Sequence, residues 1–192
     1  TYKLSFGVKA TANLFDLDES RLTPAQAGDP SLQNYNTFSP NIGAGVYLHS
    51  DKAYVGLSIP IFIETNRYDD NEVAIFKEKI NYYLIAGYVF DFTDSIKFKP
   101  AFLSKMTEGA PLQIDVSGNF MINEKFVIGG SYRTDDSISI LAGFQISPSF
   151  YLGYAFDYTV SELNKYNDGS HEIILRYQFV KNQSKIKSPR FF

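Results

Sequence analysis

The sequence predicts an all-β fold, and specifically an antiparallel transmembrane β-barrel. Three observations lead to this prediction. Apolar and polar residues alternate with a period of two in almost every patterned segment. No run reaches the ~18 apolar residues that a membrane-spanning helix needs, whereas the strands of a barrel alternate and leave no such run. Short and long connections between the alternating segments follow each other in turn.

The alternation is clearest in the first segment, residues 2–13. One face of an extended chain there is apolar: Tyr2, Leu4, Phe6, Val8, Ala10 and Ala12. The other face is polar or small: Lys3, Ser5, Gly7, Lys9, Thr11 and Asn13. Because successive side chains of a strand point to opposite faces, this pattern predicts a strand with one apolar and one polar face.

The same alternation predicts roughly ten strands, each near the ~9–11 residues with which a tilted strand crosses a membrane. They occupy residues 2–13, 41–49, 53–59, 79–90, 96–102, 112–122, 126–133, 137–146, 150–159 and 171–179. Pro100 marks a local break in the ladder, because proline has no backbone N–H to donate. No segment has a convincing helical period.

Charged, amide and glycine residues gather on the faces opposite the apolar rows. The polar side chains there are Lys3, Lys9, Lys97, Lys99, Asp115, Asn119, Arg133, Gln145, Asp157, Glu172, Arg176 and Gln178. The glycines are Gly7, Gly43, Gly45, Gly56, Gly87, Gly129, Gly143 and Gly153. In a soluble sandwich these faces would meet bulk water; in a membrane barrel they would line the lumen, where curvature favours small residues.

The connections favour the barrel over the sandwich. Tight turns are predicted at 50–52, 91–95, 123–125 and 147–149, and longer links at 14–40, 60–78, 104–111 and 160–170, with 134–136 a short member of that second series. Outer-membrane barrels of bacteria alternate short periplasmic turns with longer outer loops. We therefore expect a barrel over residues 1–179, with its turns and a basic tail over 180–192 in the periplasm.

Composition excludes several classes of function. Charge is nearly balanced, with 18 Lys+Arg against 21 Asp+Glu, so a basic nucleic-acid-binding surface is not expected. The absence of cysteine excludes disulfides, thiolate zinc sites and cysteine nucleophiles. No cofactor or resident metal is expected.

The link 14–40, acidic at its start, is interpreted as a solvated outer loop, or alternatively as a surface that binds an exported partner.

The two histidines offer little catalytic chemistry. We place both His49 and His171 on the polar face near strand ends. Ser170 precedes His171 and therefore points to the opposite face, which disfavours a serine–histidine pair. The acidic segments 16–20 and 167–172 could supply oxygen ligands to Ca²⁺, but a solvated turn is the simpler interpretation, and a local salt link explains Arg133 beside the acidic turn 134–136.

The end of the chain contains two candidate functional segments. The barrel-closing strand is predicted to carry a lipid-facing row at Ile173, Leu175, Tyr177 and Phe179, and His171, at its start, belongs to the same strand. Beyond it, the tail is either a disordered end near anionic headgroups or a peptide that docks on a periplasmic partner. In the docking interpretation the contacts come from Lys185, Lys187, Pro189, Arg190, Phe191 and Phe192.

Several motifs resemble a known family. They are "GGSYRTDDSIS", "YAFDYT", "GSHEIILRYQF", the hairpin "NIGAGVYLHSDKAYVGLSIP" and the terminal "SPRFF". In this order and spacing, from roughly Pro40 onward, the chain resembles the PorP/SprF-family outer-membrane proteins of the type IX secretion and gliding-motility system of Bacteroidota.

The resemblance implies a non-enzymatic protein of the cell outer membrane, in contact with outer-membrane lipids. It implies an export partner or surface anchor for a large secreted adhesin, associated with periplasmic and lipoprotein components of the apparatus. Because the family has strands that precede this region, we expect the C-terminal ten or so strands of a larger barrel, with additional strands pairing the first and the last.

Two other classes remain open. A diffusion porin or specific channel of the outer membrane would have an open lumen and conduct ions across a planar bilayer. A soluble β-sandwich binding module would be extracted into buffer without detergent.

Overall fold

A single antiparallel sheet forms most of the protein. The structure, a computed structural model, describes residues 1–18, 35–68 and 74–179. The sheet consists of β1 (Lys3–Leu17), β2 (Tyr35–His49), β3 (Ala53–Ile59), β6 (Asn81–Tyr88), β7 (Phe90–Asp91), β8 (Ile96–Thr107), β9 (Gln113–Ile122), β10 (Phe126–Arg133), β11 (Ser137–Ser147), β12 (Phe150–Thr159) and β13 (Ser170–Tyr177). A separate hairpin pairs β4 (Thr65–Tyr68) with β5 (Ala74–Glu78), and a 3₁₀ turn, η2, covers Glu162–Lys165.

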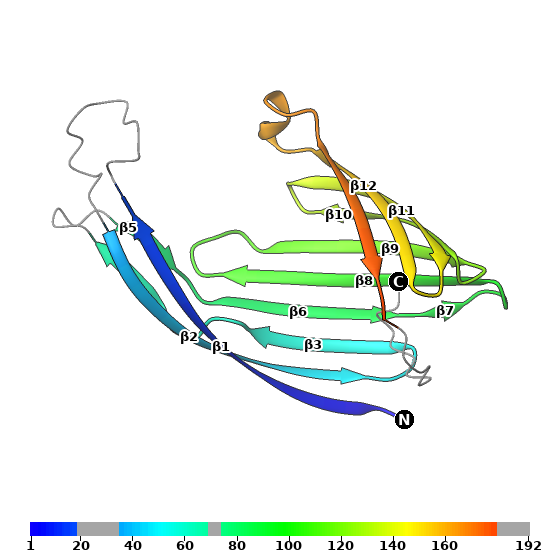
Figure 1. Cartoon of the computed structure of the whole chain (residues 1–192), viewed down its shortest axis with the longest axis horizontal. Coiled ribbons are helices and arrows are strands. Elements are labelled where there is room, and N and C mark those ends of the chain that lie inside the picture. Colours follow the sequence, from blue (N-terminus) through cyan, green and yellow to red (C-terminus); the bar gives the residue numbers. More distant parts are fainter. Residues whose placement is uncertain (19–34, 69–73, 180–192) are drawn as a thin grey trace.

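The strands lie in the order β1-β2-β3-β6-β8-β9-β10-β11-β12-β13, and β7 continues the β6 position against β8. Each neighbouring pair is antiparallel, which is the arrangement predicted from the alternation. The sheet is curved into a trough and is open between its two outer strands, β1 and β13 (Figure 1). The predicted all-β antiparallel class is thus confirmed, whereas closure into a barrel remains a prediction.

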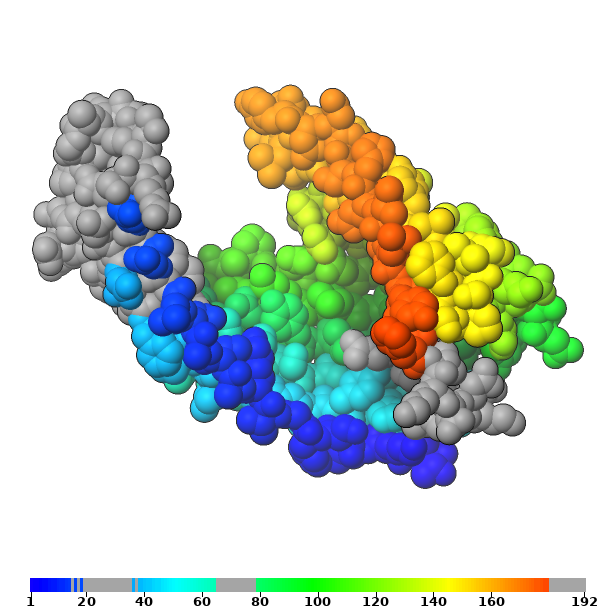
Figure 2. Space-filling view, viewed as in Figure 1, coloured from blue at the N-terminus to red at the C-terminus, as the bar shows by residue number. Residues whose placement is uncertain are grey.

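The cross-strand register carries the apolar rows from strand to strand. Phe6 lies opposite Val46, which lies opposite Leu57, and the same row continues through Leu84. The residues that alternate with this row form the other face, which lines the hollow between β1 and β13 in Figure 2. We call the apolar side the outer face and the polar side the inner face.

Short turns and longer links occupy opposite ends of the strands. The turns at 50–52, 92–95, 123–125 and 148–149 lie on the same side of the sheet as the N-terminus, which we call the turn side (Figure 1). The links at 108–112, 134–136 and 160–169 lie on the opposite, loop side. Within the described ranges, no helix has both the length and the apolarity for a membrane crossing.

Some predicted boundaries were wrong. The first two strands extend further than expected, because the ladder continues to the pair Leu17–Tyr35, so the predicted link 14–40 is shorter. The predicted link 60–78 contains the hairpin β4–β5, and β8 continues to Thr107. Local alternation underestimates such extensions because cross-strand hydrogen bonds, rather than side-chain pattern, hold the strand ends.

The break predicted at Pro100 is confirmed. The register of β8 with β6 and with β7 places Pro100 opposite Tyr88, where the two short strands separate. Pro100 cannot donate the hydrogen bond that would continue the ladder at this point. On the opposite side, toward β3, Val89, which follows Tyr88, donates its backbone N–H to the carbonyl of Lys52, 2.7 Å away.

A buried asparagine fixes the chain after β3. Asn41 is only 2% exposed on the inner face of β2. Its Oδ1 accepts hydrogen bonds from the backbone N–H groups of Phe62 and Ile63, each at 3.1 Å, and its Nδ2 donates to the carbonyl of Ile63 at 2.8 Å. Pro60 passes directly over Gly43, where a Cβ would lie 2.7 Å from the Pro60 Cα. The segment 60–63 is therefore held against the inner face.

We expect Asn41→Ala to lower the free energy of unfolding by about 1–3 kcal/mol, because the backbone N–H and carbonyl of Ile63 would lose their part-buried hydrogen bonds to Asn41. Urea unfolding of the protein in lipid vesicles would measure the change. Asn13→Ala is the matched control, since Asn13 is an exposed amide on the same face of β1. Equal stability of the two variants would contradict the role assigned to Asn41.

Candidate functional site

The outer face is apolar and uncovered across the whole sheet. Val8 is 87% exposed, Leu57 54% and Ile140 57%, whereas the only large apolar side chains buried among the described residues are Val89 and Val127. Between the ends of the large sheet's strands this face carries no Lys, Arg or Glu, and its one Asp is Asp16, at the loop-side end of β1. A face of this kind is suited to the hydrocarbon core of a membrane.

Aromatic side chains gather at both ends of the outer face. On the turn side a continuous cluster of ring contacts is formed by Tyr88, Phe90, Phe92, Phe98 and Phe120. Phe98 and Phe120 are neighbours in the register, and their ring centroids are 4.6 Å apart. Toward the loop side the exposed aromatic residues are Phe38, Tyr82, Tyr132, Tyr154 and Tyr158. Two aromatic girdles that flank an apolar band are typical of strands that cross a bilayer.

The inner face carries ion pairs that join neighbouring strands. Arg133 Nε donates to Asp115 on β9 at 2.7 Å, and its Nη1 donates to Asp136 in the following turn at 3.2 Å. Lys97 Nζ lies 2.9 Å from Glu124 Oε1 in the turn after β9. The paired side chains are partly exposed, so each ion pair contributes only about 0–1 kcal/mol of stability.

A cation also packs on an aromatic ring of the inner face. The Arg176 guanidinium of β13 lies 4.7 Å from the centroid of the Tyr151 ring on β12. The same guanidinium donates to Gln145 Oε1 on β11 at 3.3 Å. Together the contacts link three consecutive strands at the turn side of the inner face.

Tyrosines of the inner face lie across glycines of adjacent strands. A Cβ on Gly87 would lie 2.5 Å from the Tyr54 ring, and one on Gly56 would lie 3.0 Å from the Tyr47 ring. A Cβ on Gly143 would overlap the hydroxyl of Tyr151. The glycines thus provide the room that flat aromatic side chains need on the concave side of a curved sheet.

The predicted apolar row of β13 lies on the outer face. Ile173, Leu175 and Tyr177 are 75%, 64% and 61% exposed, and the ring of Phe179, just past the strand, packs edge-on against Tyr177 at 4.8 Å. The strand pairs with β12 along its length. Its other edge has no partner among the described residues, so the barrel-closing role of this strand remains a prediction.

The placement of His171 on the polar face was wrong. Its register partner is Phe156, an outer-face residue, and its Nδ1 lies 2.7 Å from the Tyr154 hydroxyl on the same face. The sequence contained the signal, because His171 is two residues from Ile173 and must share its face. His49 does lie on the inner face, opposite Lys3 and Tyr54, and its ring stacks on Tyr47 at 5.2 Å.

The other candidate residues within the described ranges make local structural contacts. In the segment 167–172, Asn167 Oδ1 accepts the backbone N–H of Gly169 at 2.8 Å and so closes the turn. Across the described ranges, no group of three or more His, Cys, Asp or Glu residues could hold a metal ion. The local salt link predicted for Arg133 is present, but its bond to Asp115 was missed because β9 lies distant in sequence. The tail residues Lys185, Lys187, Pro189, Arg190, Phe191 and Phe192 lie outside the described residues.

Comparison with known families identifies a match over most of the chain. The model for a family described as "Type IX secretion system membrane protein PorP/SprF" matches residues 1–177. The matched range contains every strand of the large sheet, and therefore both the apolar outer face and the charged inner face. No curated protein matches the chain.

The outer face provides a test of membrane insertion. We expect Ile140→Lys to cost about 2–4 kcal/mol of folding free energy in a bilayer, because it places a charge near the middle of the apolar band. Folding yield in lipid vesicles, measured from heat-modifiable gel mobility, reports the loss. Ser131→Lys, on the inner face of the adjacent strand, is the matched control and should fold with a smaller loss. The reverse order would contradict the assignment of the two faces.

The contact between Tyr151 and its glycines predicts a graded response. Gly143→Ala should be more destabilising than Gly153→Ala, because the new Cβ of the first overlaps the Tyr151 hydroxyl while that of the second would lie 3.2 Å from the ring. Thermal unfolding in detergent micelles would rank the variants. Adding Tyr151→Phe should recover part of the loss at Gly143; an unchanged loss would show that the hydroxyl is not the obstacle.

Proposed function

This chain belongs to the PorP/SprF family of type IX secretion system membrane proteins, and we propose that it serves secretion without enzymatic activity. In this proposal it is a β-barrel component of the outer membrane that acts as export partner or surface anchor for a large secreted adhesin. It docks at the same time to periplasmic or lipoprotein components of the apparatus. The observation that carries the proposal is the uncovered apolar outer face, opposed by a charged inner face, within the range that the family model matches.

Contact with outer-membrane lipids follows from the outer face. Burial of apolar area stabilises a protein by about 25 cal/mol per Å², and in this sheet the apolar area points outward, away from the inner face. Lipid chains would supply the cover that a second sheet supplies in a soluble sandwich. This argument makes the sandwich the weakest of the alternatives considered above.

We orient the protein with the turn side in the periplasm and the loop side at the cell surface. Compact turns support this orientation. Ser50 closes the first turn by accepting the backbone N–H of Ala53 on its hydroxyl at 3.1 Å, and Lys52 donates to Asp91 at 2.7 Å. That hydrogen bond raises the pKa of the Lys52 ammonium above its ordinary value. The longer links would then face the exported adhesin.

The tail provides the proposed periplasmic contact. It follows β13, which ends on the turn side, so on this orientation residues 180–192 begin in the periplasm. The sequence offers four cations, no acid and two terminal aromatics for a partner with an acidic, apolar surface. Lys185, Lys187, Pro189, Arg190, Phe191 and Phe192 are the residues to which we assign this contact.

Deletion of the residues after Val180 tests the docking. We expect the shortened protein to remain in the outer membrane but to lose co-purification with periplasmic and lipoprotein components of the apparatus. Affinity purification from native membranes, followed by mass spectrometry, measures this association. A paired replacement of Phe191 and Phe192 by alanine should reproduce the loss, whereas Tyr166→Ala, an 86% exposed aromatic on the loop side, should not. Unchanged association after the deletion would refute the docking role.

A further inference from the structure

Side chains do not fill the outer face evenly. Over β10, β11, β12 and β13 there is a hollow of about 360 Å³, which we call the Ala142 hollow. Six outer-face side chains line it: Phe126, Ala142, Phe144, Leu152, Tyr154 and Ile173. Ala142 is the smallest of the six and lies between Ile128 and Tyr154 in the register, so its short side chain leaves room among larger neighbours. The volume is within the ~300–1,000 Å³ of sites that hold small molecules.

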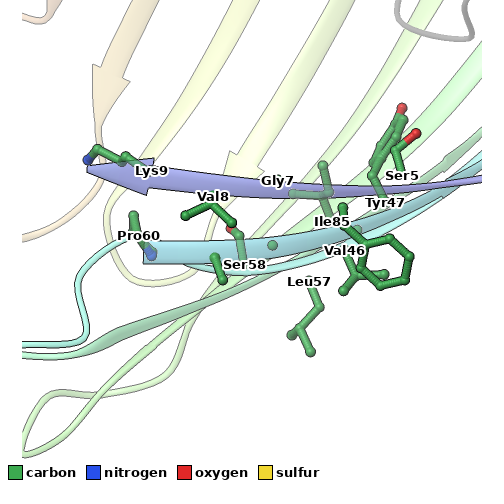
Figure 3. A pocket seen from close by; sticks show the side chains of 14 residues that line it. Ser5, Gly7, Val8, Lys9, Val46, Tyr47, Leu57, Ser58, Pro60 and Ile85 are labelled. Atoms are coloured by element: carbon green, nitrogen blue, oxygen red, sulfur yellow. The ribbon is translucent and has the colours of Figure 1, made fainter. Parts of the chain in front are cut away.

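A larger hollow, of about 480 Å³, borders β1. Figure 3 shows its lining, with Lys9 and Tyr47 on one face of the sheet and Leu57 on the other. Gly7 of this strand has no neighbour within 4 Å of its Cβ position, and β1 is the outermost strand of the sheet. That hollow is open along β1, and we assign no ligand to it. The Ala142 hollow, in contrast, lies over β11 and β12, each of which is paired on both of its edges.

A hydrogen-bonded pair borders the Ala142 hollow on its loop side. Tyr154 lines the hollow, and its hydroxyl lies 2.7 Å from Nδ1 of His171. The His171 ring also packs against its register partner Phe156, with 4.8 Å between the ring centroids. Along β13, His171 is one outer-face position nearer the loop side than Ile173, which lines the hollow. Both members of the pair are exposed on the outer face.

The pair has one more hydrogen-bond donor than the bond between its members uses. A neutral imidazole has one N–H, and a phenol has one O–H. If the Tyr154 hydroxyl donates to Nδ1, the N–H of His171 remains on Nε2; if Nδ1 donates, the O–H of Tyr154 remains. Neither residue has a second hydrogen-bond partner among the described residues. A donor without an acceptor is costly in hydrocarbon, so a membrane ligand that supplies an acceptor is favoured here.

Polar and apolar groups follow one another along these strands in the order of a lipid molecule. From the loop side toward the turn side come first the pair His171 and Tyr154, next Ala142 and Ile173, and then Phe144 and Leu152. On the orientation proposed above, the loop side is the cell surface. An outer-leaflet lipid would then have its headgroup above the pair, its acyl chains beside the hollow, and the linking carbonyls between the two.

We propose that the Ala142 hollow binds one acyl chain of an outer-leaflet lipid. The carbonyl of the ester or amide linkage of this chain accepts the remaining hydrogen bond of the His171–Tyr154 pair. The chain then runs over Ala142 toward the turn side. This is a specific lipid site, distinct from the general contact that the apolar face makes with the bilayer, and it rests on the membrane location and orientation of the proposed function.

The outer face of a neighbouring barrel fits the same site less well. Such a face would bring apolar side chains into the hollow, but its backbone carbonyls are already paired in the ladder of its own sheet. It would therefore leave the donor of the His171–Tyr154 pair without an acceptor. A lipid supplies the chain and the carbonyl in one molecule.

Competition between two matched lipids tests this recognition. The full-length protein, purified in detergent and depleted of lipid, receives equal amounts of two phosphatidylcholines. The chains of dimyristoyl phosphatidylcholine are ester-linked, whereas those of ditetradecyl phosphatidylcholine are ether-linked and lack the carbonyls. Native mass spectrometry separates the two complexes by mass. We expect about fivefold more of the ester lipid to be retained, the factor that corresponds to one ordinary hydrogen bond.

Substitutions assign the effect to the site. The double variant His171→Phe/Tyr154→Phe removes both donors and should retain the two lipids equally. Ala142→Phe fills the hollow and should lose both lipids. Ala86→Phe, at an outer-face alanine of β6 outside the hollow, is the matched control and should behave as the unaltered protein. Equal retention of the two lipids by the unaltered protein, or undiminished retention by Ala142→Phe, would overturn the proposal.

Photo-cross-linking identifies the occupant in the protein from native membranes. p-Benzoylphenylalanine replaces Phe144, on the wall of the hollow, and irradiation follows purification in detergent, so that only lipid held by the protein is labelled. We expect a lipid adduct at Phe144 and none at the control position Phe120, on the outer face of β9. A peptide adduct, or no adduct in a protein that resists carbonate extraction, would overturn the lipid site alone. If carbonate extracts the protein, the membrane location fails, and with it the proposed function.

Discussion

The outward direction of the large apolar side chains determines the rest of this structure. In a water-soluble sheet these side chains would pack against a second layer, but here Val89 and Val127 are the only large apolar side chains buried among the described residues. At the membrane location proposed above, lipid replaces the second layer and removes water as a hydrogen-bond partner for the backbone. Each strand must then pair with its neighbours, which explains why one continuous antiparallel ladder extends from β1 to β13.

The inner face, in contrast, has to accommodate crowded and charged side chains. Curvature crowds its side chains, and it also carries most of the charged residues of the sheet. Tyrosines therefore lie flat across glycines, and ion pairs such as Arg133–Asp115 connect adjacent strands. Asn41 makes a third kind of inner-face contact, because its side chain accepts hydrogen bonds from the backbone N–H groups of the segment 60–63, which crosses β2. Among the described residues, every inner-face glycine of the interior strands has a neighbour over it, and part of the charge on these strands is paired.

Most of the fold could be predicted from the sequence, because the period-two pattern is a local property. The strand segments, the tight turns and the break at Pro100 all follow from residues within a few positions of one another. The errors in strand length arose where pairing between strands, rather than local sequence, sets the strand ends. The strands of Leu17 and Tyr35 continue to these residues because they pair with each other. The misplacement of His171 had a different origin, since a count of positions from Ile173 gives the correct face.

The sequence by itself determined which residues belong to each face of each strand, since alternation needs no information about neighbours. Only the tertiary structure decided which residues meet across strands. Arg133 meets Asp115 rather than another inner-face carboxylate, and Asn41 meets Ile63 rather than a residue of its own hairpin turn. These contacts depend on register and curvature, which arise when all the strands are aligned together. The uncovered position of Gly7 likewise becomes visible only after every other inner-face glycine has acquired its neighbour.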